Sequence, residues 1–115
     1  MRQAFALEGF FSIMNDWLVD DATARKFLGL PAGWKHGQQL PGDALRRIQD
    51  VVGIWERLQV AYSPQDADAW VKKPNRFLGG RTPLETMAAG DLAVVRTHVD
   101  AAARMVLHAG HGSLV

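Results

Sequence analysis

The chain has 115 residues, of which 48% are hydrophobic and 22% are charged. This length suits one compact domain, or one core shared by two small helical lobes, and the apolar share is too high for a disordered chain. The formal net charge of +1 argues neither for nor against a nucleic-acid partner, and the lack of cysteine excludes disulfides and thiol catalysis, as suits a reducing cytoplasm.

Apolar residues recur at helical spacing along the chain, and no segment shows the sustained alternation of a strand, so we predict an all-α fold. The first helix is expected over residues 4–18. Because this segment contains Glu8 and Asp16 and no long apolar run, it indicates an amphipathic helix and not a signal peptide or a membrane span. Its apolar stripe consists of Phe10, Ile13, Met14 and Trp17.

A second helix is expected over residues 23–28, with Asp20 or Asp21 as its N-cap, and the sequence GLPAG at residues 29–33 breaks it. Residues 34–39 are expected to form one or two helical turns. A long helix over residues 43–62 follows. Its apolar side is expected to consist of Leu45, Ile48, Val52, Trp55, Leu58 and Tyr62.

Gly53 interrupts the long helix and weakens it by about 1 kcal/mol relative to alanine, which indicates a close helix contact at this position. Ser63 can cap the next helix, whose apolar side includes Trp70 and Val71. The last helix is expected over residues 92–108. Its apolar face is expected to consist of Leu92, Val95, Val99, Ala102 and Val106. Because the nearest signal of a boundary is the sequence YSP at residues 62–64, we divide the chain into residues 1–62 and residues 63–115.

Residues 74–90 contain a dense set of start and stop signals. Pro74 prevents the preceding helix from continuing, and Gly79 and Gly80 supply a turn in which a positive φ costs little. Thr82 and Glu85 are three residues apart, which predicts a capping box at the start of a short helix. Gly90 then ends this helix.

These elements resemble the toxin-binding domain of Xre/MbcA/ParS-type antitoxins, over residues 66–115. The residues that carry the resemblance are Trp70, Pro74, Asn75, Leu78, Gly79, Gly80, Thr82, Pro83, Leu84, Glu85 and Gly90. The length and layout of the chain are also similar to those of a stand-alone MbcA-like antitoxin. The resemblance implies a compact bundle of six or seven helices, with a degenerate helix-turn-helix-like N-terminal half and a toxin-binding C-terminal half.

The resemblance also implies a function. Such a protein is the antitoxin of a type II toxin-antitoxin system, needs no cofactor, catalyses nothing, and neutralises a RES-type toxin that degrades NAD. Its C-terminal segment is expected to enter and occlude the toxin's active site, although the motif does not fix which residue enters. The tail residues are Gly110, His111, Gly112, Ser113, Leu114 and Val115. Further candidates for the toxin contact, each of which can equally be a solvated surface residue, are Arg76, Arg81, Arg96, Arg104 and His108.

Residues 25–47 carry five basic side chains and one acidic side chain. With the predicted helix, turn and helix, this excess indicates a helix-turn-helix that contacts operator DNA, or else a solvated basic face. The motif is degenerate because Pro31 and Gly33 lie in its turn and Gly37 lies inside its short second helix. The candidate DNA-binding residues are Arg25, Lys26, Trp34, Lys35, Arg46 and Arg47, with Trp34 expected to be partly exposed. The alternative function is therefore a DNA-binding autoregulator whose C-terminal half dimerises.

Other kinds of chemistry find little support. The segment Gly79 to Thr82 lacks the spaced glycines and the lysine of a P-loop. His98, His108 and His111 have neither a cysteine nor an adjacent carboxylate to complete a zinc site, so we predict no metal. No serine has a nearby histidine with an orienting carboxylate, and we expect no enzyme. We expect a cytoplasmic protein that contacts no membrane and forms a homodimer or a larger hetero-oligomer with the toxin.

Overall fold

The computed structural model describes residues 3–110, and in that range it contains six α-helices, one short 3-10 helix and no strand. The all-α prediction is thereby confirmed. The elements are α1 (Gln3–Asp16), α2 (Asp21–Leu28), α3 (Ala44–Ala61), α4 (Pro64–Trp70), η1 (Arg76–Leu78), α5 (Pro83–Ala88) and α6 (Leu92–Gly110).

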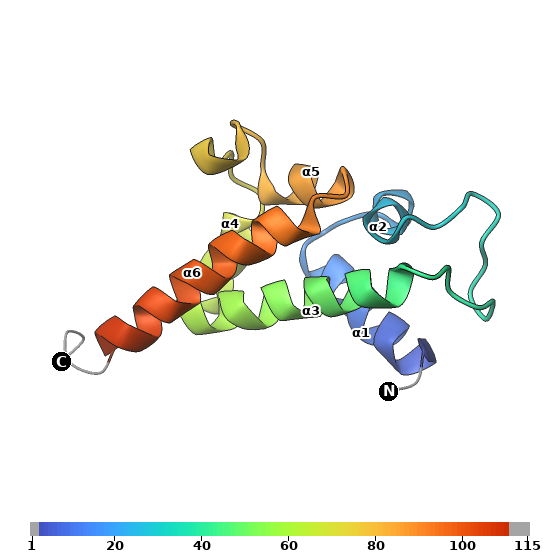
Figure 1. Cartoon of the computed structure of the whole chain (residues 1–115), viewed down its shortest axis with the longest axis horizontal. Helices are drawn as coiled ribbons and strands as arrows, with labels where there is room; N and C mark the ends of the chain where they lie inside the picture. The colour runs from blue at the N-terminus through green and yellow to red at the C-terminus, as the bar shows by residue number, and fades with distance from the viewer. Residues whose placement is uncertain (1–2, 111–115) are drawn as a thin grey trace.

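The long helix α3 lies at the centre of the bundle, with α1 on one side and α6 along another (Figure 1). The pair α3 and α6 has the most extensive packing of any two helices in the described chain. Both helices contribute buried apolar side chains to this contact, on α6 as far as Ala103. These residues are Ile48, Val51, Ile54 and Leu58 on α3, and Leu92, Val95, Val99 and Ala103 on α6.

The apolar stripe predicted for the first helix is confirmed, because Phe10, Ile13, Met14 and Trp17 are all buried. The ring of Phe10 contacts the ring of Phe27 on α2 edge to face, with 6.5 Å between the centroids. This geometry is the one that aromatic pairs prefer. The stripe therefore fastens α1 to α2 as well as to α3.

Local capping signals determine where α2 and α4 begin. The N–H of Thr23 donates to the Asp20 carboxylate at 2.7 Å, and the N–H of Asp66 donates to the Ser63 hydroxyl at 3.2 Å. Each bond satisfies an N–H group that the helix itself cannot pair. Asp20 is thus the cap of α2, one of the two predicted candidates, and Ser63 caps α4 as predicted.

The prediction of helical turns over residues 34–39 is wrong. The segment between α2 and α3 forms successive turns, in which Trp34 N–H donates to Pro31 O at 3.0 Å and Gln38 N–H donates to Lys35 O at 3.1 Å. Gly37 takes a φ of 97°, which a helix does not permit. The expected second helix of a helix-turn-helix is therefore missing from this segment.

Trp34 is also more buried than predicted, with 5% of its surface exposed. Its indole N–H donates to Gln39 O at 3.0 Å, which closes the loop around the ring. The prediction for α3 needs a smaller correction. Leu45 is exposed, whereas Val51 and Ile54 are fully buried, because α3 packs against both α1 and α6 and so buries a wider arc than one stripe.

Candidate protein-interaction surface

The predicted capping box at the start of α5 is present. The N–H of Glu85 donates to the Thr82 hydroxyl at 3.0 Å, and the N–H of Thr82 donates to the Glu85 carboxylate at 2.8 Å. These hydrogen bonds lower the pKa of Glu85, since they favour the ionised carboxylate. The N–H of Leu84 also donates to Val71 O at 3.1 Å, so that the start of α5 is joined to the end of α4.

The segment before α5 is a closed loop around Asn75. The Asn75 side chain accepts a hydrogen bond from Phe77 N–H at 2.9 Å. Its backbone N–H donates to Arg81 O, and its backbone O accepts from Gly80 N–H, both at 3.0 Å. Gly79 and Gly80 have φ values of 70° and 85°, which confirms the predicted turn. The loop is therefore held by its own backbone, and it places Leu78 in the core.

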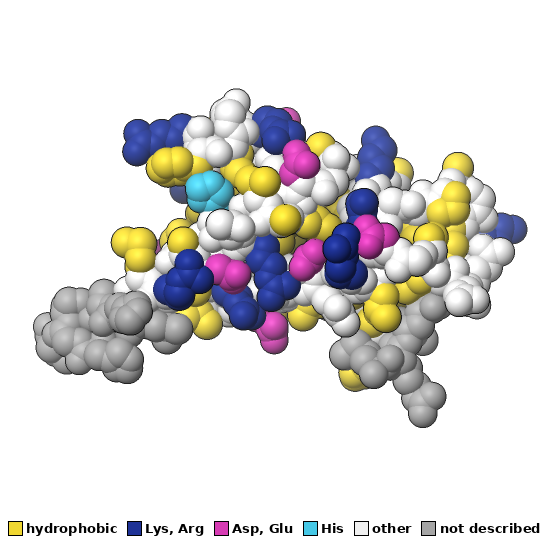
Figure 2. Space-filling model, in the orientation of Figure 1, with side chains coloured by type: hydrophobic (Ala, Val, Ile, Leu, Met, Phe, Trp, Pro, Cys, Tyr) yellow, Lys and Arg dark blue, Asp and Glu magenta, His cyan; other side chains and the backbone are white. Residues whose placement is uncertain are grey.

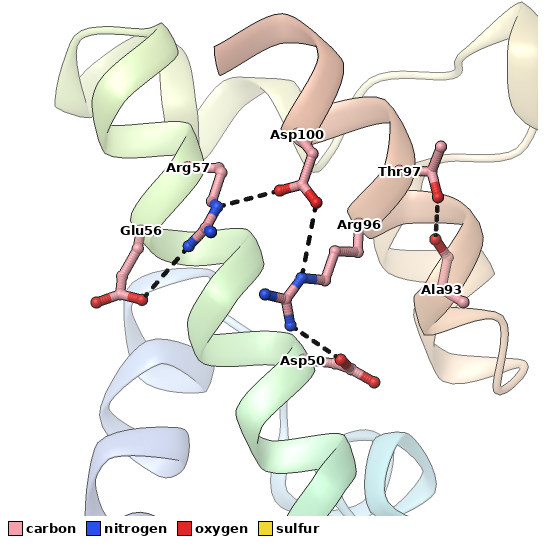
Figure 3. A network of polar contacts seen from close by, with 7 residues as sticks. All are labelled: Asp50, Glu56, Arg57, Ala93, Arg96, Thr97 and Asp100. Atoms are coloured by element: carbon pink, nitrogen blue, oxygen red, sulfur yellow. Dashed lines mark hydrogen bonds and ion pairs between the residues drawn. The ribbon is translucent and has the colours of Figure 1, made fainter. Parts of the chain in front are cut away.

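Figure 3 shows a polar network that fastens α6 to α3. Arg96 Nη1 lies 3.0 Å from Asp50 Oδ1, and Arg96 Nε lies 3.9 Å from Asp100 Oδ2. Asp100 Oδ1 is 3.1 Å from Arg57 Nε. The Arg96 guanidinium lies directly over Gly53, where a Cβ atom would come within 2.8 Å of it. The close helix contact predicted at this glycine is confirmed.

The four arginines that we predicted as toxin contacts differ in their surroundings. Arg96 belongs to the network between α3 and α6. Arg76, Arg81 and Arg104 are exposed. The guanidinium of Arg76 lies 5.1 Å from the centroid of the Phe77 ring, and Arg81 Nη2 is 3.4 Å from Asp91 Oδ2. Three of the four are therefore accessible to a partner.

The C-terminal candidates have no described side-chain geometry. His108 and Gly110 belong to the last turns of α6, where side chains lie outside the described part of the structure. His111, Gly112, Ser113, Leu114 and Val115 lie outside the described residues altogether. Their role in toxin binding stays a prediction.

The structure also contains an exposed apolar surface that we did not predict. Phe77 on η1 lies beside His98 on α6, with 5.3 Å between the ring centroids. Val94 and Met105, also on α6, are exposed. The face drawn in Figure 2 shows hydrophobic side chains next to a histidine, with Lys and Arg side chains nearby. Spacings of four and seven residues from Val94 to His98 and from His98 to Met105 are the sequence signal for this face.

The candidate DNA-binding residues are divided between internal contacts and solvent. The guanidinium of Arg25 donates to Trp34 O, lies 5.7 Å from the centroid of the Trp34 ring, and pairs with Asp21 at 2.7 Å. Arg47 donates to Phe27 O at 3.4 Å. The structure leaves the other three basic residues exposed. These are Lys26, Lys35 and Arg46.

Two kinds of feature are missing from the described residues, a membrane-spanning helix and a metal-binding cluster. Between residues 3 and 110, no helix combines the length and the apolar character needed to cross a membrane. The same part of the chain brings together no group of three or more His, Cys, Asp or Glu side chains that could hold a metal ion.

Comparison with known proteins relates the chain to a protein family. Residues 58–103 match the family model of the antitoxin Xre/MbcA/ParS C-terminal toxin-binding domain. The chain is 34% identical over 105 residues to the uncharacterized protein y4oB of Sinorhizobium fredii (strain NBRC 101917 / NGR234), an alignment that covers 83% of this chain and 81% of y4oB. No solved structure gives a significant match. The chain therefore belongs to the same family as y4oB, and its residues 58–103 carry the match to the Xre/MbcA/ParS toxin-binding domain.

Proposed function

We propose that this protein is the antitoxin of a type II toxin-antitoxin system, that it acts in the cytoplasm, and that its partner is a RES-type toxin that degrades NAD. In this proposal the C-terminal segment enters the toxin's active site and excludes the dinucleotide. The observation that carries the proposal is the match of residues 58–103 to a toxin-binding domain. The partner class and the occlusion rest on the resemblance of the motif around the double glycine.

The course of α6 supports an occluding role for the chain end. The last buried side chain described on this helix is Ala103, and Arg104 and Met105 are already exposed. Because a helix rises about 1.5 Å per residue, residues 104–110 extend roughly 10 Å past the core. Figure 1 shows this end of α6 pointing away from α1 and α2. A segment presented in this way can enter a cleft without unfolding the domain.

The contacts that hold α6 also support this role, because a C-terminal segment can block the active site only if the helix that carries it stays fixed. The ion pairs of Arg96 with Asp50 and of Asp100 with Arg57 fix α6 against α3. At the other end of the helix, the capping box of Thr82 and Glu85 fixes α5 directly before α6. The helix is thus held in place at its start and in its middle, and its C-terminal end remains available for contact with the toxin.

The test is co-expression with the toxin encoded by the adjacent reading frame, followed by pull-down and measurement of cellular NAD. The full chain should preserve NAD, and a variant lacking residues 110–115 should bind the toxin but fail to preserve NAD. The thermal unfolding of this variant should match that of the full chain, since the buried part of α6 ends at Ala103. Unchanged protection by the shortened chain would exclude the plug.

A second candidate function is autoregulation of the operon through operator DNA, in a homodimer or a larger complex with the toxin. The exposure of Lys26, Lys35 and Arg46 favours it, since phosphate contacts need accessible cations. The absence of a helix from residues 34–39 removes the element that would read bases. A gel shift on the chain's own promoter, repeated at rising salt, tests it. Binding that is absent or independent of salt would refute this function.

A further inference from the structure

We propose that the toxin docks on an apolar ridge formed by Phe77, Val94, His98 and Met105, and that this ridge supplies most of the affinity while the chain end supplies the inhibition. The inference rests on the proposed function, because it takes the toxin as the partner. Phe77, Val94 and Met105 are 66%, 46% and 71% exposed. A contiguous exposed surface of this kind on a small domain is typical of a binding site.

The ridge is one continuous surface. Val94, His98 and Met105 lie on one side of α6, since four and seven residues correspond to about one and two turns. The Phe77 ring joins this side from η1 and lies 5.3 Å from the His98 ring, centroid to centroid. The opposite side of α6 carries the core residues Val95 and Val99. One side of the helix therefore serves the fold and the other faces the solvent.

Phe77 is held out of the core by the loop that carries it. Its N–H donates to the Asn75 side chain at 2.9 Å, and the next residue, Leu78, is buried as the anchor of the same turn. Because the backbone is fixed on both sides of Phe77, ordering this ring on binding costs little conformational entropy. A large aromatic side chain that is held in place and exposed is the usual anchor of a binding hot spot.

The position of the ridge identifies its occupant. Phe77, Val94 and His98 all lie within residues 58–103, the part of the chain that matches a toxin-binding domain. Met105 continues the same side of α6 toward the end that we propose enters the toxin's cleft. A toxin seated on the ridge would therefore receive the chain end without a second binding site. The partner is thus the toxin and not a second copy of this chain.

Charge defines the chemistry of the toxin's complementary surface. Arg76 lies over the Phe77 ring, and Arg104 is exposed next to Met105. In the described part of the chain neither arginine belongs to an ion pair, so both are available to a partner's carboxylates. The toxin surface that fits the ridge is an apolar hollow with an acidic rim.

The test uses the full chain and the purified toxin encoded by the adjacent reading frame. F77A and M105A should each weaken binding by roughly tenfold or more, as expected for hot-spot residues. F5A is the matched control, because Phe5 on α1 is 68% exposed, about as much as Phe77 at 66%, but lies outside the ridge. Its affinity for the toxin should equal that of the wild type. R76E should weaken binding most at low salt.

A second measurement needs no substitution. Met105 is exposed, so peroxide should oxidise it readily in the free chain, whereas Met14 and Met87 are buried and should react slowly. Bound toxin should abolish the oxidation of Met105. Equal oxidation of Met105 in the free and bound chain, or wild-type affinity of F77A and M105A, would overturn the proposal that the toxin docks on the ridge. A wild-type chain that neither binds nor inhibits the toxin would instead overturn the proposed function.

Discussion

Replacing Gly53 by alanine tests how α3 and α6 are held together. A Cβ atom at this position would lie 2.8 Å from Cζ, 2.9 Å from Nη1 and 3.0 Å from Nη2 of Arg96. Non-bonded carbon and nitrogen atoms do not approach this closely, so the guanidinium must move. Its contacts with Asp50 at 3.0 Å and with Asp100 at 3.9 Å are then lost or lengthened.

Two effects of similar size oppose each other in this variant. Alanine in place of glycine inside a helix adds about 1 kcal/mol to the free energy of unfolding. The side chains of Arg96 and Asp50 are 32% and 28% exposed, so solvent screens their pair, and each lost ion pair costs only about 0.2–1 kcal/mol. The two changes nearly cancel, and we expect G53A to lie within about 0.5 kcal/mol of the wild type.

A double-mutant cycle tests whether the gain in helix propensity and the loss of the ion pair cancel. The free energy of unfolding is measured in urea for wild type, G53A, R96A and the double variant. Once R96A has removed the obstruction, G53A should stabilise the chain by about 1 kcal/mol. G9A is the matched control, because a Cβ at Gly9 on α1 meets no atom within 4 Å. It should stabilise both backgrounds equally. A full gain from G53A in the wild type would refute the argument that Arg96 requires a glycine beneath it.

Three further predictions concern the fold. T82A should lower the free energy of unfolding by about 1 kcal/mol because it removes the cap of α5, whereas T97A, which removes an exposed hydroxyl inside α6, should cause no loss in the same urea experiment. F10A should cost about 3–5 kcal/mol and F5A less than about 0.5, since only Phe10 is buried. The pKa of Glu85 is lowered in the folded chain, so its contribution to stability is present above about pH 4.5 and is lost as the pH falls below this value. Urea midpoints measured from about pH 6 to pH 3 should therefore fall less steeply in E85Q than in wild type.

Helix boundaries set by local chemistry could be predicted from the sequence. Ser63 caps α4, Thr82 and Glu85 form their capping box, and Gly79 and Gly80 take positive φ as expected. Each signal acts within a few residues, so neither the partner helix nor the fold needs to be known.

Features that depend on distant contacts could not be predicted in this way. Trp34 is buried because its indole N–H donates to Gln39 O and its ring lies against the guanidinium of Arg25 on α2. The exposure of Phe77 depends likewise on the closed loop around Asn75. For α6, Leu92, Val95 and Val99 of the predicted face are confirmed as core, whereas Ala102 and Val106 are only partly buried and Ala103 is buried instead. The exposed apolar surface on the opposite side depends on η1, which places Phe77 beside His98.

The packing of α3 against α6 makes the C-terminal half of this chain dependent on a helix of the N-terminal half. Residues 58–103, which match the family model, pack against a helix that lies almost wholly ahead of them, since α3 ends at Ala61 and the match begins at residue 58. A fragment beginning at residue 63 would leave Val95 and Val99 without their apolar partners and should aggregate. Any other N-terminal segment joined to residues 63–110 would therefore have to supply an equivalent of α3.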